Sequence, residues 1–302
     1  MIVFSHSDSD GHVTPPGHPE RVDRMAAVEA GLRDLSLERR VSPLGSRADV
    51  LLCHPAAYHD HIAQSAPPEG WAQIDGDTYL SPGSYAAAMR AVGGMGAAVD
   101  AVLGGEAASA FVACRPPGHH AEAARAMGFC LFGTVAIGAA LALQRPEVKR
   151  VAIVDFDVHH GNGTQDLLWD EGRCLFTSSQ EMPLFPGTGR ADERGAHGQM
   201  INLPLRAGSD GAAMRAAYER LILPAVSEWQ PDLLLVSAGF DAHHADPLAS
   251  LQWEADDFRW LAQRLWEVSG GRVVSALEGG YDLPALTESV RAYVGEMARL
   301  SA

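Results

Sequence analysis

Short apolar runs alternate with longer amphipathic segments along almost the whole of this chain, and this alternation restricts the possible folds more than any other feature. The runs are apolar throughout, which is typical of strands buried on both faces. The segments between them carry Ala, Leu and Arg at helical spacing, and several begin after Ser, Thr, Asp or Pro. Such strands and helices in alternation predict a mainly parallel sheet between two helical layers, a three-layer α/β/α fold.

The elements predicted in this way cover most of the chain. The strands are Ile2–Ser5, Ser109–Cys114, Val151–Asp155, Cys174–Thr177, Leu233–Ser237 and Val273–Leu277. The helices are Pro19–Leu32, Pro82–Leu103, Thr134–Leu143, Gly211–Trp229, Asp256–Val268 and Pro284–Leu300. No repeat, low-complexity linker or break in composition divides the chain, so we expect residues 1–302 to form one domain.

Composition and charge exclude several classes of protein. Hydrophobic residues make up 47% of the chain, too many for a disordered or fibrous protein. The net charge of −15 argues against a nucleic-acid-binding protein, because no surplus of cations neutralises phosphates. The four cysteines form no C-x-x-C pair that would support a thiolate zinc site. The N-terminus lacks the regions of a signal peptide, and no run of 18 residues is apolar, so we expect a cytoplasmic protein without a membrane partner.

Four of the predicted strands run directly into clusters of His, Asp, Glu and Gly. These segments are Arg115–His120, Asp155–Gly163, Gly239–Asp246 and Glu278–Tyr281. Ligands of open α/β sheets bind beyond the carboxyl ends of the strands. We therefore expect the four segments to converge on one site.

The spacing of Asp157 and His159 predicts a metal site. Side chains two residues apart on an extended chain leave the same face, so this carboxylate and this imidazole can hold one divalent cation. A third ligand has to come from another strand end, where Asp246 is the best candidate. Two carboxylates and one histidine suit Zn²⁺, and equally Fe²⁺, Mn²⁺ or Co²⁺, and three protein ligands leave a position open for water.

His119 and His120 are candidates for acid–base chemistry beside this metal. Adjacent side chains diverge on an extended backbone, so the two rings are poorly placed to bind one ion, whereas histidine titrates near neutral pH. Asp155 and Asn162 are expected to accept hydrogen bonds from the rings and to fix their tautomers. Tyr281 follows two glycines and is expected either to place its hydroxyl over the site as an oxyanion donor or to pack at a turn.

These residues belong to motifs that resemble those of the histone deacetylase superfamily, which includes acetylpolyamine amidohydrolases and acetoin-utilisation proteins. The shared motifs occur in the family's order over residues 18 to 283. They resemble the class II branch, which has Asn, and not Asp, at the position of Asn162. The motifs are His18–Arg21, Arg115–His120, Gly128–Phe132, Asp155–Gly163, Phe185–Gly189, Ser237–Leu248 and Glu278–Tyr281. The resemblance implies an arginase-like α/β fold and a zinc-dependent amide hydrolase, with Fe²⁺ or Co²⁺ as substitutes for zinc.

The resemblance also implies roles for individual residues. Zinc would be held by Asp157, His159 and Asp246. His120 would be the general base, His119 its electrostatic or acid partner, and Tyr281 the group that polarises the acyl carbonyl. The two histidines would be held by Asp155 and Asn162. A structural monovalent cation, usually K⁺, would be bound by Asp155, Asp157, His159, Ser178 and Ser179. A narrow tunnel for an aliphatic acyl-lysine stem would be lined by Gly128, Phe129 and Phe185, with further substrate contacts from Asp77, Leu248 and Gly280.

One position indicates which class of acylated substrate to expect. Class II polyamine deacetylases carry Glu after the Asp-Pro that follows the third ligand, and here that residue is Leu248, as in lysine deacetylases. We therefore expect acyl-lysine in a protein or peptide, with an acetylpolyamine or another small acetylated amine as the alternative. A non-catalytic module that binds acylated ligands is disfavoured by His119, His120 and Tyr281, and an arginase-type ureohydrolase by the single Asp-x-His set. An oligomer is compatible with the sequence.

Some positions depart from the family pattern or have no catalytic role in it. Gly133-Thr134 and Ser179-Gln180 stand where the family often has Asn-Asn or Asn-Thr and Leu-His. We expect altered packing at the first pair and an altered loop towards Phe185 at the second. His243 and His244 are expected to support the zinc loop, and Glu20 to pair with Arg21.

Overall fold

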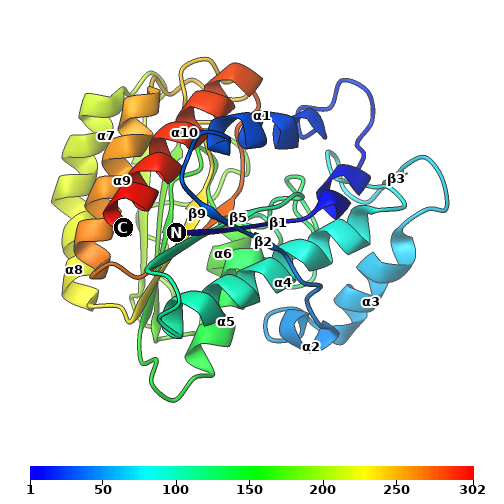
Figure 1. The fold of residues 1–302 in the computed structure, drawn as a ribbon, viewed down its shortest axis with the longest axis horizontal. Coiled ribbons are helices and arrows are strands. Elements are labelled where there is room, and N and C mark those ends of the chain that lie inside the picture. The colour runs from blue at the N-terminus through cyan, green and yellow to red at the C-terminus, as the bar shows by residue number, and fades with distance from the viewer.

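The computed structural model describes residues 1–302 as one large sheet between layers of helices (Figure 1). The sheet consists of β1 (Ile2–Ser5), β2 (Glu38–Val41), β5 (Ser109–Ala113), β6 (Val151–Asp155), β7 (Cys174–Glu181), β8 (Met200–Leu205), β9 (Leu233–Ala238) and β10 (Val273–Leu277). Their order is β2-β1-β5-β10-β9-β6-β7-β8, and every neighbouring pair is parallel. The predicted mainly parallel α/β sheet is therefore confirmed.

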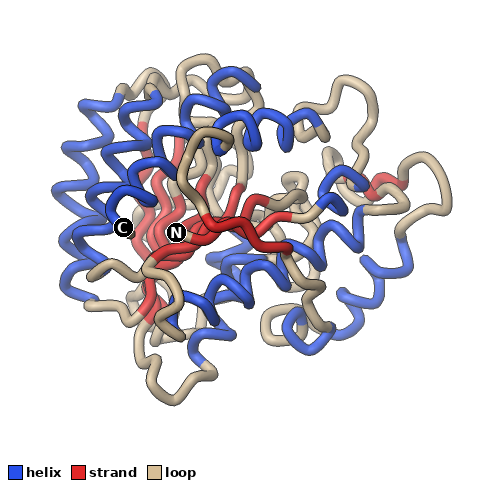
Figure 2. Tube along the Cα trace, viewed as in Figure 1, coloured by secondary structure: helices blue, strands red, loops and turns tan.

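Helices cover both faces of the sheet (Figure 2). One layer holds α1 (Asp23–Leu32), α7 (Gly211–Ala217), α8 (Leu223–Trp229), α9 (Ala255–Ser269) and α10 (Leu283–Leu300). The other holds α4 (Ser84–Leu103) and α5 (Thr134–Leu143), with the shorter α2 (Arg47–Val50), α3 (Ala56–Ser65) and α6 (Asn162–Leu167) around them. A 3₁₀ turn, η1 (Ser7–Gly11), follows β1.

Each central strand contributes apolar side chains to a core on both faces of the sheet. Val3 and Phe111 pack in the core under α1, α9 and α10, whereas Ile2 and Ala110 pack in the core under α4 and α5. Successive side chains of a strand point to opposite faces, so a strand covered on both sides has to be apolar throughout. This is why the six strands predicted from apolar runs are the six central strands of the sheet.

The two strands of the sheet that the sequence did not predict are its edges. β2 has the sequence Glu-Arg-Arg-Val, and none of its residues is buried. β8 contains Pro204, which has no N–H to donate to a neighbouring strand. An edge strand has a neighbour on one side only, so it needs no continuous apolar run. A separate short hairpin of β3 (Ala72–Gln73) and β4 (Tyr79–Leu80) carries Asp77 close to its turn.

The helix predicted over residues 211–229 is interrupted in the structure. One π-helical turn, η2 (Tyr218–Ile222), separates α7 from α8. Pro224 stands in the first turn of α8, directly after this turn. Proline has no N–H and its ring crowds the preceding turn, so the helical hydrogen bonds change register there.

Helix α4 is long and apolar enough to cross a membrane by length and composition alone. However, 67% of its most apolar window is buried inside the fold. A Cβ atom at Gly93 would lie 2.2 Å from the carbonyl oxygen of Pro43, so the neighbouring loop lies directly on the helix. A buried core helix passes the same length and hydropathy test, and α4 is packed as one.

Candidate active site and metal centre

Two predicted metal ligands, Asp157 and His159, lie together after β6, and a third residue, which is acidic, joins them from the loop after β9. Strands β6 and β9 are neighbours in the sheet, which brings Asp241 to the same place. The Nδ1 atom of His159 lies 3.2 Å from Oδ1 of Asp157 and 3.2 Å from Oδ2 of Asp241. All three side chains are buried, and their ligand atoms lie within 4.8 Å of one another. They form one compact cluster of two carboxylates and an imidazole.

The structure does not place Asp246 in this cluster, contrary to expectation. Its carboxylate accepts hydrogen bonds from the backbone N–H groups of Tyr281, at 2.7 Å, and of Leu248, at 3.0 Å. The chain turns after Asp241, so a residue five positions further on faces the Tyr281 loop instead. Asp241 takes the position that we expected for Asp246.

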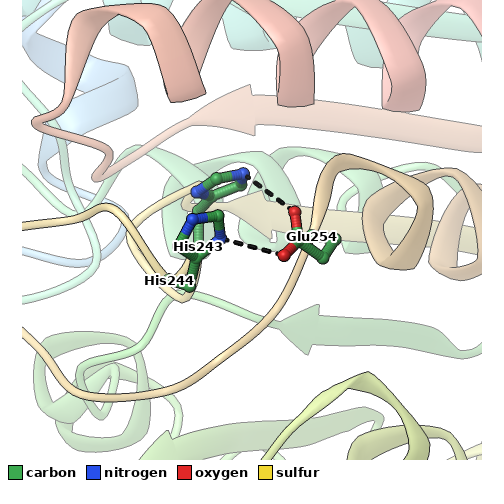
Figure 3. Close-up of side chains that lie close together, drawn as sticks. All are labelled: His243, His244 and Glu254. Atoms are coloured by element: carbon green, nitrogen blue, oxygen red, sulfur yellow. Dashed lines mark ion pairs between the residues drawn. The ribbon is translucent and has the colours of Figure 1, made fainter.

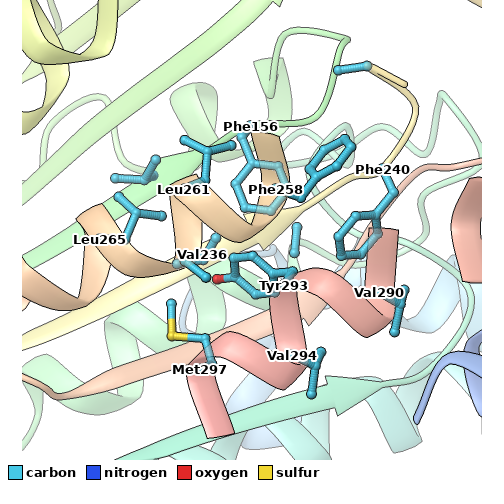
Figure 4. Packing of buried hydrophobic residues seen from close by; sticks show 14 of the residues in the cluster. Phe156, Val236, Phe240, Phe258, Leu261, Leu265, Val290, Tyr293, Val294 and Met297 are labelled. Atoms are coloured by element: carbon cyan, nitrogen blue, oxygen red, sulfur yellow. The ribbon is translucent and has the colours of Figure 1, made fainter. Parts of the chain in front are cut away.

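A sequence signal for Asp241 exists in the spacing after the two strands. Phe156-Asp157 directly follows β6, and Phe240-Asp241 follows β9 after one glycine, Gly239. The rings of Phe156 and Phe240 point into the core and lie 5.9 Å apart (Figure 4). Neighbouring residues on an extended chain point to opposite sides, so each buried ring turns the next carboxylate towards the site.

The charges of the cluster fit a divalent cation. Asp157 and Asp241 are buried close together, and neither forms an ion pair with Lys or Arg. Burial and the charge of Asp157 raise the pKa of Asp241. Burial would lower the pKa of His159, but hydrogen bonds to the two carboxylates raise it to about 10. The two buried carboxylates therefore favour a positive charge between them. Two carboxylates and one imidazole are also a donor set suited to zinc, iron or cobalt.

The two predicted catalytic histidines lie beside this cluster with their expected acceptors. His119 Nδ1 lies 2.9 Å from Oδ2 of Asp155, and His120 Nδ1 lies 2.7 Å from Oδ1 of Asn162. Burial opposes charge on both rings, but the carboxylates of Asp157 and Asp155 raise the pKa of His119 well above its usual value. Burial and the charge of His119 lower the pKa of His120 well below its usual value. The surroundings of the two rings thus shift their pKa values in opposite directions.

Glu278 holds the backbone of the histidine loop, a role that the sequence analysis did not assign. Its Oε2 accepts hydrogen bonds from the N–H of Gly118, at 2.6 Å, and from the N–H of His119, at 3.1 Å. Its Oε1 is buried without a partner. The following residue, Gly279, donates its N–H to Oδ2 of Asp157 at 2.8 Å. One short segment after β10 thus connects the histidine loop, the carboxylate cluster and Tyr281.

Tyr281 lies over the site and is held from three sides. Its backbone is bound by Asp246, its ring lies 5.8 Å from the ring of Phe129, and the guanidinium of Arg24 lies 5.0 Å from its ring centre. Burial raises the pKa of its hydroxyl well above the usual value. The hydroxyl therefore keeps its proton and is available as a hydrogen-bond donor.

A pocket of about 250 Å³ opens onto these groups. Its lining consists of Asp77, His120, Gly128, Phe129, His159, Leu184, Phe185, Leu248 and Tyr281. Five of the six predicted substrate residues are among them, and Leu184 was not predicted. Gly280 is not part of the lining, and its carbonyl accepts a hydrogen bond from Nε of Arg24 at 2.7 Å.

Comparisons of the sequence and of the fold with known proteins find similarity to histone deacetylases. The histone deacetylase domain model matches residues 18–297. The chain is 38% identical to "Histone deacetylase-like amidohydrolase" of Pseudomonas aeruginosa over 90% of this chain and 75% of that protein. It is also 38% identical to "Histone deacetylase 10, chloroplastic" of Oryza sativa, over 98% of this chain and 73% of that protein. The crystal structure of the HDA15 HD domain superposes with a TM-score of 0.93 at 30% identity, covering 97% of this chain and 90% of that one.

The chain belongs to the histone deacetylase family. Its sheet and flanking helices have the arginase-like α/β fold of that family. It is a hydrolase of the deacetylase class, and metal binding follows from the family.

In this deacetylase the region expected to hold a monovalent cation contains an unpartnered oxygen. Ser178 lies opposite Asp155 in the pairing of β6 with β7, and its buried hydroxyl has no hydrogen-bond partner. The hydroxyl of Ser179 lies 2.6 Å from the hydroxyl of Tyr218, which leaves its backbone carbonyl as the oxygen that Ser179 would offer to a cation. The Ser178 side chain thus fits a cation beside Asp155.

The positions that depart from the family pattern have local structural roles in this deacetylase. Helix α5 begins at Thr134, and a Cβ atom at Gly133 would lie 2.3 Å from the side chain of Leu167. Gln180 donates a hydrogen bond to the carbonyl of Gly189 at 2.6 Å, at the end of the loop that carries Phe185. Both departures are therefore matched by packing around the site.

Glu20 forms a buried ion network instead of the expected pair with Arg21. Its carboxylate contacts the guanidinium groups of Arg24, at 3.0 Å, and of Arg115, at 2.5 Å. Arg21 lies on the surface, 3.6 Å from Asp23. The i, i+4 spacing of Glu20 and Arg24 was a usable signal, but no local pattern indicates a partner 95 residues away.

Proposed function

We propose that this protein is a zinc-dependent deacylase that removes an acetyl group from acyl-lysine in a protein or peptide. The observation that carries the proposal is the position of His120: an imidazole whose Nδ1 is held by Asn162 lines the pocket together with His159 and Tyr281. A base, a metal ligand and a hydroxyl donor therefore face the same small space. Amide hydrolysis requires this combination.

The metal would be held by Asp157, His159 and Asp241, which contribute two carboxylates and one imidazole. When bound, zinc supplies Lewis-acid activation of water and of the acyl oxygen. A K⁺ ion beside Asp155 and the hydroxyl of Ser178 would balance the buried carboxylates behind the histidines.

The protein's own residues then account for the proton transfers. His120 accepts the proton of the attacking water at Nε2, because its Nδ1 faces Asn162. The carboxylates of Asp157 and Asp155 raise the pKa of His119 and so favour its protonated form, which would return a proton to the leaving amine. Tyr281 donates a hydrogen bond to the acyl oxygen as negative charge develops on it, which is worth on the order of 3 kcal/mol in comparable oxyanion holes. The products are acetate and a free amine.

The lining of the pocket favours a lysine side chain. Phe129 and Phe185 offer apolar walls for four methylene groups, and Leu248 adds a third apolar contact where polyamine deacetylases have Glu. Asp77 is the acidic residue of the lining and is placed to accept hydrogen bonds from a peptide backbone or from a cationic amine. Deacetylation of an acetylpolyamine is the alternative, and Leu248 disfavours it.

The test is a comparison of two substrates with three proteins loaded with zinc. Wild type, Tyr281→Phe and Leu248→Glu are assayed on a fluorogenic acetyl-lysine peptide and on acetylputrescine. We expect wild type to prefer the peptide, Tyr281→Phe to lose about 10²- to 10³-fold in kcat, and Leu248→Glu to shift the preference towards the amine. His61→Ala, on the exposed face of α3, is the control and should behave as wild type. Wild type inactive on both substrates would refute the proposal.

A further inference from the structure

A second cluster of metal-binding side chains lies outside the pocket, between β9 and α9. His243 and His244 follow each other on the loop after β9, and Glu254 directly precedes α9 (Figure 3). Their ligand atoms lie within 4.8 Å of one another. None of the three lines the substrate pocket, so the reaction leaves the cluster without a role.

The geometry of the cluster is close to that of a bound ion. The two rings lie 4.5 Å apart with 32° between their planes, and both face the carboxylate of Glu254 (Figure 3). Nδ1 of His244 is 3.1 Å from Oε1 of Glu254, and Nε2 of His243 is 3.9 Å from its Oε2. Tetrahedral zinc bonds of about 2.0 Å place ligand atoms roughly 3.3 Å apart. The two observed nitrogen–oxygen distances lie on either side of this value.

The surroundings allow the three side chains to reach the spacing of zinc ligands. The side chain of His243 is 6% exposed and that of Glu254 is 64% exposed, so one side of the cluster is fixed and the other can move. The Nδ1 atom of His243 accepts a long hydrogen bond of 3.2 Å from the N–H of Ala245. Binding through Nε2 moves the ring proton to Nδ1 and replaces this bond with a bond to the metal. Water can complete the coordination from the open side.

We propose that His243, His244 and Glu254 form a second, solvent-accessible site for a divalent transition-metal ion. Two imidazoles and one carboxylate suit Zn²⁺, Ni²⁺ or Cu²⁺, whereas Mg²⁺ and Ca²⁺ prefer oxygen ligands alone. An ion at this site joins the loop that carries Asp241 to the first turn of α9. Its occupancy stabilises that loop and is independent of the reaction in the pocket.

The test measures how many further zinc ions each protein binds. Protein already loaded with zinc in the pocket is titrated with ZnCl₂ by isothermal titration calorimetry, as wild type, His244→Ala and Glu254→Gln. Wild type should bind one further ion. Loss of an outer-sphere partner alone costs about 10- to 100-fold in metal affinity, so each variant should lose at least that much. His61→Ala removes an exposed histidine elsewhere and should bind as wild type.

Thermal unfolding separates loss of the ion from loss of the fold. Glu254→Gln keeps a side-chain oxygen for the first turn of α9, which Glu254 caps, so its Tm without added zinc should equal that of wild type. In protein whose pocket is already loaded with zinc, further ZnCl₂ should raise the Tm of wild type and of His61→Ala but not of the two cluster variants. The proposal is overturned if wild type takes up no further ion, or if His244→Ala and Glu254→Gln bind it as wild type does.

Discussion

At the scale of single residues, the site depends on which carboxylate faces the imidazole of His159. Asp241 does so because Phe240 is anchored in the core, whereas Asp246 binds the backbone of Tyr281. The sequence indicated that two acidic residues follow β9, but the choice between them depends on where the chain turns. That turn is fixed by packing, and local spacing does not encode it.

Replacing the two aspartates separately distinguishes their roles. Asp241→Asn removes a charged ligand, so we expect zinc affinity to fall by 100-fold or more, beyond the roughly 10- to 100-fold lost with outer-sphere partners. Asp246→Asn should keep its zinc and lose activity through the Tyr281 loop. Zinc content after dialysis against a weak chelator is the measurement. An Asp246→Asn protein that loses its zinc while Asp241→Asn keeps it would contradict the assignment.

Glu278 offers a second test at this scale. Glu278→Ala leaves the N–H groups of Gly118 and His119 buried without an acceptor, which costs about 1–3 kcal/mol for each unsatisfied group. We expect kcat to fall by about 10- to 100-fold with little change in KM, because the histidines shift and the pocket walls do not. Glu278→Gln keeps an acceptor oxygen and should restore most of kcat. Equal losses in both variants would mean that the charge of Glu278 is what matters.

At the scale of elements, predictability follows from how completely an element is buried. The six central strands were predicted because both of their faces are covered, and the edge strands β2 and β8 were not. The long helices α4, α5, α9 and α10 were recognised from their periodicity, with ends close to those observed. Short elements such as α2 and α6 have too few residues for a periodic pattern, and tertiary contacts determine them.

The ion network of Glu20 connects elements that are distant in sequence and should be visible in the pH dependence of stability. Burial would raise the pKa of Glu20, but Arg115 and His12 hold it well below its usual value. Its contribution is therefore present above the unfolded pKa of about 4.3 and is lost as the pH falls towards the folded pKa. Glu20→Gln leaves two guanidinium groups without their carboxylate and should lower the free energy of unfolding at pH 7 by about 3–5 kcal/mol.

Urea unfolding of wild type and Glu20→Gln between pH 7 and pH 4 measures this effect. The difference between the two proteins should stay constant down to about pH 5 and become smaller below it, as wild type loses the contribution of the carboxylate. Glu29→Gln, in an exposed pair with Arg39, is the matched control and should change stability by less than about 0.5 kcal/mol. A difference that grows as the pH falls would contradict this account.

At the scale of the whole molecule, four loops from the carboxyl ends of parallel strands meet at one site. That convergence was predictable, because parallel strands in one sheet present their ends at the same edge. The lining of the pocket was less predictable, because Leu184 contributes to it and Gly280 does not. The paired carboxylates at the centre are buried groups whose charge a bound metal would balance, so metal binding and stability are coupled.

Metal removal tests this coupling. A ligand at 1,000 times its Kd stabilises the folded state by about 4 kcal/mol, so EDTA should lower the Tm of wild type by several degrees and ZnCl₂ should restore it. Differential scanning calorimetry makes the comparison in the His244→Ala background, which removes the second proposed metal site, and Asp241→Asn in that background is a control that should not respond to EDTA. A wild-type Tm that EDTA leaves unchanged would argue against a zinc ion in the cluster.

The central claim is that His120 takes the proton of the attacking water in a zinc deacylase. It is tested most directly by kcat/KM on an acetyl-lysine peptide for zinc-loaded wild type and His120→Ala, with zinc content measured in both. General acid–base groups contribute about 10²- to 10⁴-fold, so His120→Ala should lose activity in that range at unchanged zinc content. A variant with full zinc and kcat/KM within twofold of wild type would contradict the account.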